Sequence, residues 1–196
     1  MRTWQKTVFC DEKKFNLDGP DGWSHYWHDL RKENQYLMSR HSGGGGVMVW
    51  IGFTHDRKLA LYLWDSTVTA TNIVDVLESE VEPFFDEVDD PSWTFYQDNA
   101  PVHSARLTQG WLLDKNIMTE RMPPYSPDLN QAENVISMLC RLVYENGRQF
   151  LTVAQLKVAI KKAWPKVPQI GINNAIDSMP ARLAAVINHA GGPTDY

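Results

Sequence analysis

Residues 93–122 read WTFYQDNAPVHSARLTQGWLLDKNIMTERM, and this stretch decides the fold class. It begins with a run rich in β-branched and aromatic residues, 93–98, which is typical of a strand. Residues 104–115 have the apolar spacing of a helix, and residues 117–122 are again strand-like. A strand, a helix and a strand in succession favour a mixed sheet, so we expect an α/β domain.

Three more strands are expected upstream of this stretch. Residues 7–17 form the first and end at a turn rich in Asp and Gly. Residues 47–53 and 59–64 are apolar runs joined by a short polar turn, which predicts an antiparallel pair. The sequence therefore predicts a mixed five-stranded sheet flanked by helices.

The remaining helices are predicted from apolar residues that recur every three or four positions. They cover residues 69–85, 129–144, 152–164 and a last segment that stops at residues 191–192. Pro83 is expected to disturb the end of the first, and Thr152 to cap the third. In the last helix Leu183, Val186 and Ile187 are expected to face inward, as a C-terminal helical extension.

Length and composition indicate one domain with ordinary globular content. The chain has 196 residues, a formal charge of −5 and 43% hydrophobic residues. No run approaches the roughly 18 apolar residues of a membrane span, so we expect no membrane contact. Cys10 and Cys140 are expected to be two buried thiols. The negative charge argues against a surface that binds nucleic acid everywhere, so any DNA would be held locally.

Two aspartates stand where strands disfavour charge. Asp11 interrupts an apolar strand, and Asp98 ends the strand that begins the opening stretch. Each alone is more simply read as an exposed strand end or a turn former. Two such acids on separate strands make coincidence a weaker explanation.

Glu133 is the third acid of interest. With Asn130 as N-cap it falls at the third helical position, where Glu often folds back to cap the helix. Carboxylates from two strands and a helix start can instead converge at one edge of a mixed sheet. Such hard oxygen ligands suit Mg²⁺ or Mn²⁺, and two ions together can promote in-line displacement at phosphorus.

The surrounding motifs decide between these readings. Four segments occur in the order seen in the Tc branch of the mariner transposase superfamily, which this chain resembles over nearly its whole length: DEKKFNLDG at 11–19, GGGVMVW at 44–50, QDNAPVH at 97–103 and SPDLNQAEN at 126–134. The 34 residues between Asp98 and Glu133 also equal that branch's spacing for its second and third catalytic acids.

The resemblance implies a ribonuclease-H-like fold whose catalytic, metal-binding triad is Asp11, Asp98 and Glu133. It implies two Mg²⁺ or Mn²⁺ ions, no organic cofactor, and duplex DNA as partner, both transposon ends and target. The implied reaction is phosphodiester hydrolysis at transposon ends, then attack of the freed 3′-hydroxyl on target DNA. A homodimer is compatible with it, and a nuclear location is expected.

The chain departs from the family pattern in two places. The family has Pro-Ile where this chain has Gln131-Ala132, and Leu-Trp where it has Val135-Ile136, so the start of the helix that carries Glu133 is less rigidly preset. The family also carries helix-turn-helix domains before its first catalytic strand, and only about ten residues precede Asp11 here. We therefore expect an excised catalytic domain or a shortened, domesticated product.

Other residues have weaker claims to a role. His103 follows the Asp98 motif, but most such histidines only pack. Glu12 should point to the face opposite Asp11, and Asp128 belongs to a turn, where Asp commonly bonds its own backbone. A last group is Lys157, Lys161, Lys162 and Lys166, either a solvated helix face or a contact for the DNA backbone.

Two alternatives to a transposase stay open. One is a domesticated protein that keeps the fold as a non-catalytic binding or scaffold module. The other is a different metal nuclease of ribonuclease-H-like fold that acts on RNA or branched DNA. The motif order favours the transposase.

Overall fold

The computed structural model describes residues 4–20, 31, 45–192 and 194. Within these residues five strands form one sheet in the order β3-β2-β1-β4-β5. They are β1 (Thr7–Asn16), β2 (Gly46–Phe53), β3 (Lys58–Trp64), β4 (Thr94–Gln97) and β5 (Thr119–Arg121). Strand β1 is antiparallel to β2 and parallel to β4, and β2 and β3 form the expected antiparallel pair. The predicted mixed five-stranded sheet is confirmed.

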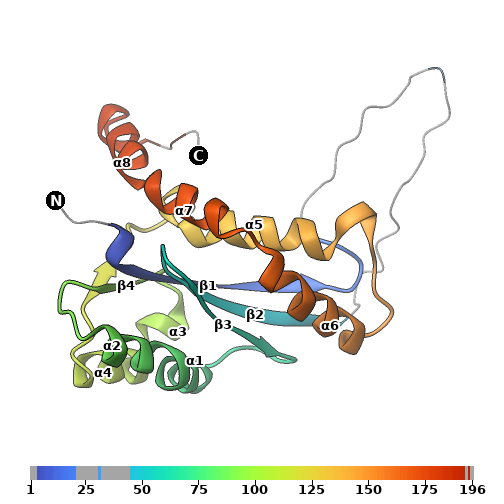
Figure 1. The fold of residues 1–196 in the computed structure, drawn as a ribbon, viewed down its shortest axis with the longest axis horizontal. Coiled ribbons are helices and arrows are strands. Elements are labelled where there is room, and N and C mark those ends of the chain that lie inside the picture. The colour runs from blue at the N-terminus through green and yellow to red at the C-terminus, as the bar shows by residue number, and fades with distance from the viewer. Residues whose placement is uncertain (1–3, 21–30, 32–44, 193, 195–196) are drawn as a thin grey trace.

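Helices cover both faces of this sheet (Figure 1). One layer holds α1 (Ala70–Val76), the π-helical η2 (Leu77–Val81), α2 (Glu82–Val88), α3 (Pro101–Ser104) and α4 (Arg106–Asp114). The other holds α5 (Gln131–Val143), α6 (Val153–Ala163) and α7 (Gln169–Asp177), and α8 (Met179–Asn188) extends beyond the sheet. The 3-10 segments are η1 (Trp4–Lys6), η3 (Pro127–Leu129), η4 (Glu145–Gly147) and η5 (Trp164–Lys166).

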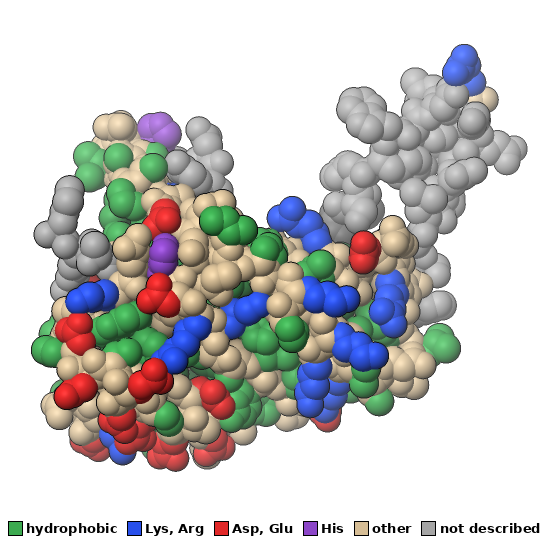
Figure 2. All heavy atoms as spheres, in the orientation of Figure 1, with side chains coloured by type: hydrophobic (Ala, Val, Ile, Leu, Met, Phe, Trp, Pro, Cys, Tyr) green, Lys and Arg blue, Asp and Glu red, His purple; other side chains and the backbone are tan. Residues whose placement is uncertain are grey.

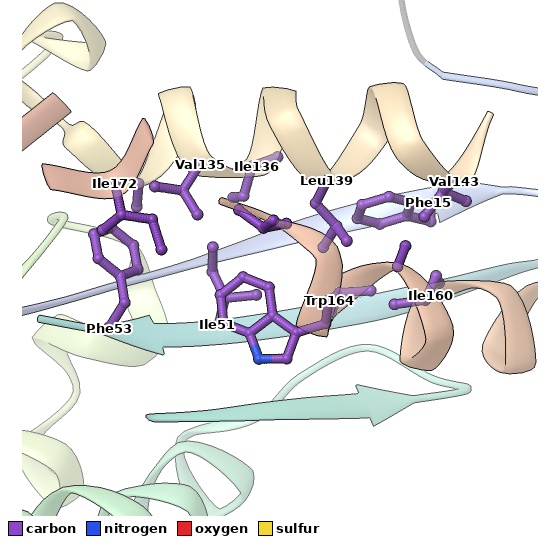
Figure 3. Close-up of a cluster of buried hydrophobic side chains, with 14 of the residues drawn as sticks. Phe15, Ile51, Phe53, Val135, Ile136, Leu139, Val143, Ile160, Trp164 and Ile172 are labelled. Carbon is purple, nitrogen blue, oxygen red and sulfur yellow. The ribbon is translucent and has the colours of Figure 1, made fainter. Parts of the chain in front are cut away.

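The larger core lies between the sheet and α5, α6 and α7. Val135, Leu139 and Val143 recur at helical spacing and point from α5 toward the sheet (Figure 3). Phe15 on β1 meets this face, and Trp164 closes it from the end of α6. This packing fixes α5 along β1, and so fixes where α5 begins.

The second core lies under the other helical layer. Trp50 and Phe95 are fully buried on that face of the sheet, against Ile73, Leu77 and Leu112. Both faces of the sheet are therefore covered, which is why β1, β2 and β4 are rich in large apolar residues. In the part of the chain that is described, no helix is long and apolar enough to cross a membrane.

One predicted helix is interrupted, and another is preceded by a short extra helix. The first contains the π-helical turn η2, which ends at Val81, two residues before Pro83, and α2 then continues the helix to Val88. The helix predicted over residues 104–115 is α4, and the short helix α3, which was not predicted, precedes it across Ala105, whose φ and ψ of −60° and 143° are not helical. Side chains replace the missing backbone bonds: Thr108 donates to the Val102 carbonyl at 2.6 Å, and Gln109 to that of His103 at 2.8 Å.

The C-terminal region differs most from expectation. Helix α7 was not predicted. On α8 the expected apolar face was wrong: Ile187 is 77% exposed, Leu183 and Val186 are only partly buried, and the buried residues are Met179 and Arg182. The reason is that α8 runs past the edge of the sheet, so little apolar surface lies beneath it (Figure 1).

The two thiols also differ from each other. Cys10 is buried, as expected, but Cys140 on α5 is only partly so.

Candidate functional site

The parallel pairing of β1 with β4 brings the two aspartates to one place. Phe9 lies opposite Tyr96 in this register, so continuing it by two residues sets Asp98 level with Asp11. Asp98 follows the last residue of β4, and its Oδ1 accepts a hydrogen bond from the Ala100 amide at 2.9 Å. The strand that contains Asp11 and the strand that Asp98 follows are therefore neighbours in the sheet.

Asp11 is held from two sides. Its Oδ1 accepts from the Glu12 amide at 2.7 Å, and its Oδ2 accepts from Asn130 Nδ2 at 2.8 Å. Asn130 is also the N-cap of α5, since its Oδ1 accepts from the Ala132 amide at 3.0 Å. One side chain therefore joins the start of α5 to the central strand, an interaction that the sequence did not reveal.

Glu133 lies in the first turn of α5 with its side chain exposed. The capping role considered from sequence is taken by another group, because the Asn130 amide donates to the Pro127 carbonyl at 3.0 Å. Asn130 caps the helix with its own side chain. The position of Glu133 is therefore not explained by helix capping.

The carboxylates share one electrostatic environment. Burial raises the pKa of Asp11 to about 8, and the charges of Glu12, Glu133 and Asp98 contribute to the rise. These acids are near enough to repel one another. Over the residues that the structure describes, however, no three His, Cys, Asp or Glu side chains are grouped closely enough to hold a metal ion.

His103 has more structure around it than the sequence suggested. Its side chain is 2% exposed, and Nε2 lies 3.0 Å from Glu12 Oε2 and 3.5 Å from Asp98 Oδ1. Burial alone would lower the pKa of His103, but the hydrogen bond and charge of Glu12 outweigh it and raise the pKa. Glu12 faces α3 while Asp11 faces the start of α5, as the alternation of the strand requires.

A hollow opens beside Asp98. Its volume is about 340 Å³, and its lining is mostly polar: Gln97, Asp98, Asn99, His103, Ser104, Gln109, Thr119 and Glu120. The buried Gln97 Oε1 and His103 Nδ1 have no hydrogen-bond partner among the described atoms. Of Asp11, Asp98 and Glu133, Asp98 is the one that lines this hollow.

The chain matches a known protein family over most of its length. Residues 6–157 match the family described as DDE superfamily endonuclease. The chain belongs to this family. The Tc3 transposase of Caenorhabditis elegans is 41% identical to this chain, over 98% of this chain and 59% of its own length. The Tcb1 transposase of Caenorhabditis briggsae is 32% identical, over 100% of this chain and 72% of its own length. This DDE chain therefore spans about three fifths of the length of Tc3 transposase.

Solved structures confirm the fold of the DDE chain. The Mos1 mariner paired-end complex with Mn has a TM-score of 0.83 at 18% identity and covers 98% of this chain and 57% of its own. The Mos1 transposase catalytic domain has a TM-score of 0.74 at 16% identity, over 98% of this chain and 85% of its own. The fold is ribonuclease-H-like, as the resemblance implied.

Proposed function

We propose that this DDE chain is the catalytic core of a transposase, which hydrolyses phosphodiester bonds at transposon ends and joins the freed 3′-hydroxyl to target DNA. The observation that carries the proposal is that Asp11 lies on β1 and Asp98 directly follows the adjacent parallel strand β4. Glu133 completes the set from the first turn of α5. Tc3 transposase, 41% identical, supports the reaction class.

The residues present fit divalent cations by charge and donor type. Asp11, Asp98 and Glu133 offer hard oxygen donors, which Mg²⁺ and Mn²⁺ prefer. Their mutual repulsion, which contributes to the raised pKa of Asp11, is what bound cations would offset. When bound, two such ions would activate the attacking oxygen and stabilise the leaving oxygen. We assign both ions to these three carboxylates.

The chain's own groups would orient the acids. Asn130 fixes Asp11 Oδ2, and the Ala100 amide fixes Asp98 Oδ1. His103, held by Glu12, stands against Asp98 from the buried side and limits its movement. A phosphodiester would therefore meet carboxylates whose positions are largely set in advance.

The partners follow from the reaction. Duplex DNA would be bound as both transposon end and target, and two copies of the chain would pair to hold two ends. The Mos1 relatives support this, since one is a paired-end complex and another a strand transfer complex. Because the target would be chromosomal DNA, the proposal includes a nuclear location.

DNA contact would begin at a basic groove, formed by Arg148, Lys162 and Lys166 between α5 and α6. The groove is a hollow of about 260 Å³ that Glu145 also lines. All three basic side chains are exposed, and no carboxylate is paired with any of them within the described residues. Lys157, one of the four lysines noted in the sequence, differs because it pairs with Asp65 at 2.6 Å.

The first experiment measures metal binding and cleavage together. Calorimetry with Mn²⁺ on the wild-type chain and on Asp98→Asn, beside nicking of supercoiled plasmid, should show binding and nicking that disappear together in the variant. The same assay on RNA and branched DNA should show a preference for duplex DNA. A folded wild-type chain that binds no Mn²⁺ would refute the proposal and favour the non-catalytic scaffold.

A further inference from the structure

A buried arginine from the far end of the chain reaches the segment that presents Glu133. Arg182 on α8 is 3% exposed, which is unusual for arginine unless its donors are paired. Its Nε donates to Ser178 Oγ at 2.8 Å, which anchors the guanidinium to its own helix. The two remaining nitrogens point toward a different element.

Those nitrogens span both sides of Glu133. Arg182 Nη1 donates to the Asp128 carbonyl at 2.5 Å, and Nη2 donates to Asn134 Oδ1 at 2.7 Å. Asp128 precedes α5 within η3, and Asn134 follows Glu133 directly. The planar fork therefore fixes the distance between the turn before α5 and the first turn of α5.

Further bonds hold the same turn from other directions. Thr194 donates to Asp128 Oδ2 from its amide at 3.0 Å and from its hydroxyl at 2.8 Å. Tyr96 on β4 donates to the Leu129 carbonyl at 3.2 Å. The turn is thus hydrogen-bonded to the central sheet and to the C-terminal region. Of Arg182, Thr194 and Tyr96, Arg182 is the residue that also donates a hydrogen bond to α5.

The local sequence explains why the start of α5 depends on hydrogen bonds from other segments. Residue 131, the first of α5, is Gln, so no proline ring presets the helix start. Gln131 is fully buried, yet neither of its side-chain polar atoms has a hydrogen-bond partner in the described structure. The first side chain of α5 therefore makes no hydrogen bond that would fix the start of the helix. The hydrogen bonds of Asn130 and Arg182 fix it instead.

We propose that Arg182, on α8, is a positioning residue for Glu133. By holding the segments on both sides of Glu133, it fixes where the third metal-binding carboxylate lies. The inference rests on the proposed function, since it concerns a carboxylate assigned there to the metal. It also gives α8 a role in the active site, although α8 lies beyond the sheet and packs little apolar surface. Residues that orient metal ligands typically change metal affinity by about 10- to 100-fold when removed.

The test is Mn²⁺ calorimetry on Arg182→Gln, Arg182→Lys and Asn134→Ala. Arg182→Gln and Asn134→Ala should each raise the Kd about tenfold with the binding stoichiometry unchanged. The Kd of Arg182→Lys should lie between the wild-type value and that of Arg182→Gln, because an ammonium group can reach one acceptor but cannot span two. The matched control is Ile73→Ala, which destabilises the opposite face of the sheet and should leave the Kd at the wild-type value.

Stoichiometry and the folded fraction together separate positioning from mere folding. Molecules that are irreversibly unfolded lower the number of sites, and a reversibly unfolded fraction raises the apparent Kd only by the reciprocal of the folded fraction. A tenfold rise in Kd for a variant that circular dichroism shows to be mostly folded therefore reports a misplaced Glu133. If Arg182→Gln does not fold, Asn134→Ala makes the same test from the other side of the hydrogen bond. Wild-type Kd values in both variants would overturn the inference, whereas a wild-type chain that binds no Mn²⁺ would instead overturn the proposed function.

Discussion

Asp11 is the residue of the site whose charge is the least favourable in the folded protein. It is a buried carboxylate with three other acids nearby, and burial first, then their charges, raise its pKa to about 8. The hydrogen bond from the Glu12 amide lowers the pKa of Asp11 and offsets only part of this rise. The metal-free protein is therefore folded against a local electrostatic penalty, as is common at functional sites.

That penalty predicts a pH dependence whose sign can be worked out. The ordinary pKa of Asp is 3.8, so between pH 4 and 8 the folded state binds a proton at Asp11 that the unfolded state does not. Stability therefore falls as pH rises through this window, by up to about 1.4 kcal/mol per pH unit. Urea unfolding in EDTA between pH 5 and pH 8 should show a flatter slope for Asp11→Asn than for wild type.

The control for this slope is Asp75→Asn on α1, where the carboxylate is exposed. It should follow the wild-type slope closely, because its charge is solvated in both states. Parallel lines for wild type and Asp11→Asn would mean that Asp11 carries no excess proton in the folded protein.

His103 and Glu12 form a second residue-scale unit. The side chain of His103 is buried and that of Glu12 is partly buried, and a hydrogen bond to a charged partner typically contributes about 1.5–3 kcal/mol. A double-mutant cycle of Glu12→Gln and His103→Ala, followed by urea unfolding at pH 6, should give a coupling energy of that order. A coupling near zero would show that the two side chains are stabilised independently.

At the scale of elements, the sequence predicted what local patterns control. The apolar runs at 47–53 and 59–64 form β2 and β3, and the three-to-four residue spacing of Val135, Leu139 and Val143 forms the buried face of α5. Asp98 was expected at a strand end, and it directly follows β4. Each of these depends on periodicity and turn residues near the segment itself.

What sequence did not predict depends on interactions between distant elements. Asn130 binds Asp11 across 119 positions, and Arg182 reaches Asp128 across 54. Neither has a local pattern, and the apolar residues of α8 suggested a core face where the structure buries Arg182 instead. The break at Ala105 is similar, since it is stabilised by side chains of α4 rather than by a proline or glycine.

The end of α6 offers a prediction at this scale. Lys58 on β3 donates to the carbonyls of Trp164, Pro165 and Val167, at 3.2, 3.0 and 2.8 Å. Lys58→Met keeps the apolar stem but removes the donor, so it should cost about 1–2 kcal/mol of unfolding free energy. Amide hydrogen exchange should quicken locally, around η5.

The matched control is Lys6→Met, which removes an exposed pair with Asp90 at 2.9 Å and should change stability by less than about 1 kcal/mol. Equal effects of the two substitutions would show that the three hydrogen bonds of Lys58 do not stabilise the chain around η5.

Over the whole molecule the charges are unevenly spread. The net charge is −5, yet Figure 2 shows Lys and Arg side chains gathered over α6 and Asp and Glu side chains over the layer of α1, α2 and α4. A polyanion would be repelled from the acidic layer and attracted to α6. This division is consistent with DNA that is held at one part of the surface rather than over all of it.

The basic groove makes that division measurable through salt dependence. Removing one lysine that neutralises a phosphate should reduce the slope of log K against log salt by about 0.9, so the double variant Lys162→Ala, Lys166→Ala should reduce it by about 2. Binding to any duplex should weaken alike, because phosphate contacts carry little sequence information. Fluorescence anisotropy with a labelled duplex, measured between about 50 and 200 mM salt, gives both quantities.

A matched lysine lies on the acidic side. Lys115 pairs with Glu82, and both lie on the helical layer opposite the basic groove. Lys115→Ala should therefore leave the slope of log K against log salt unchanged. The double variant should also keep the wild-type Kd for Mn²⁺, because the groove lies at the end of α5 away from Glu133. An unchanged slope in the double variant would place the DNA elsewhere. A slope that falls while Mn²⁺ binding holds would separate the surface that holds the duplex from the carboxylates proposed to cut it.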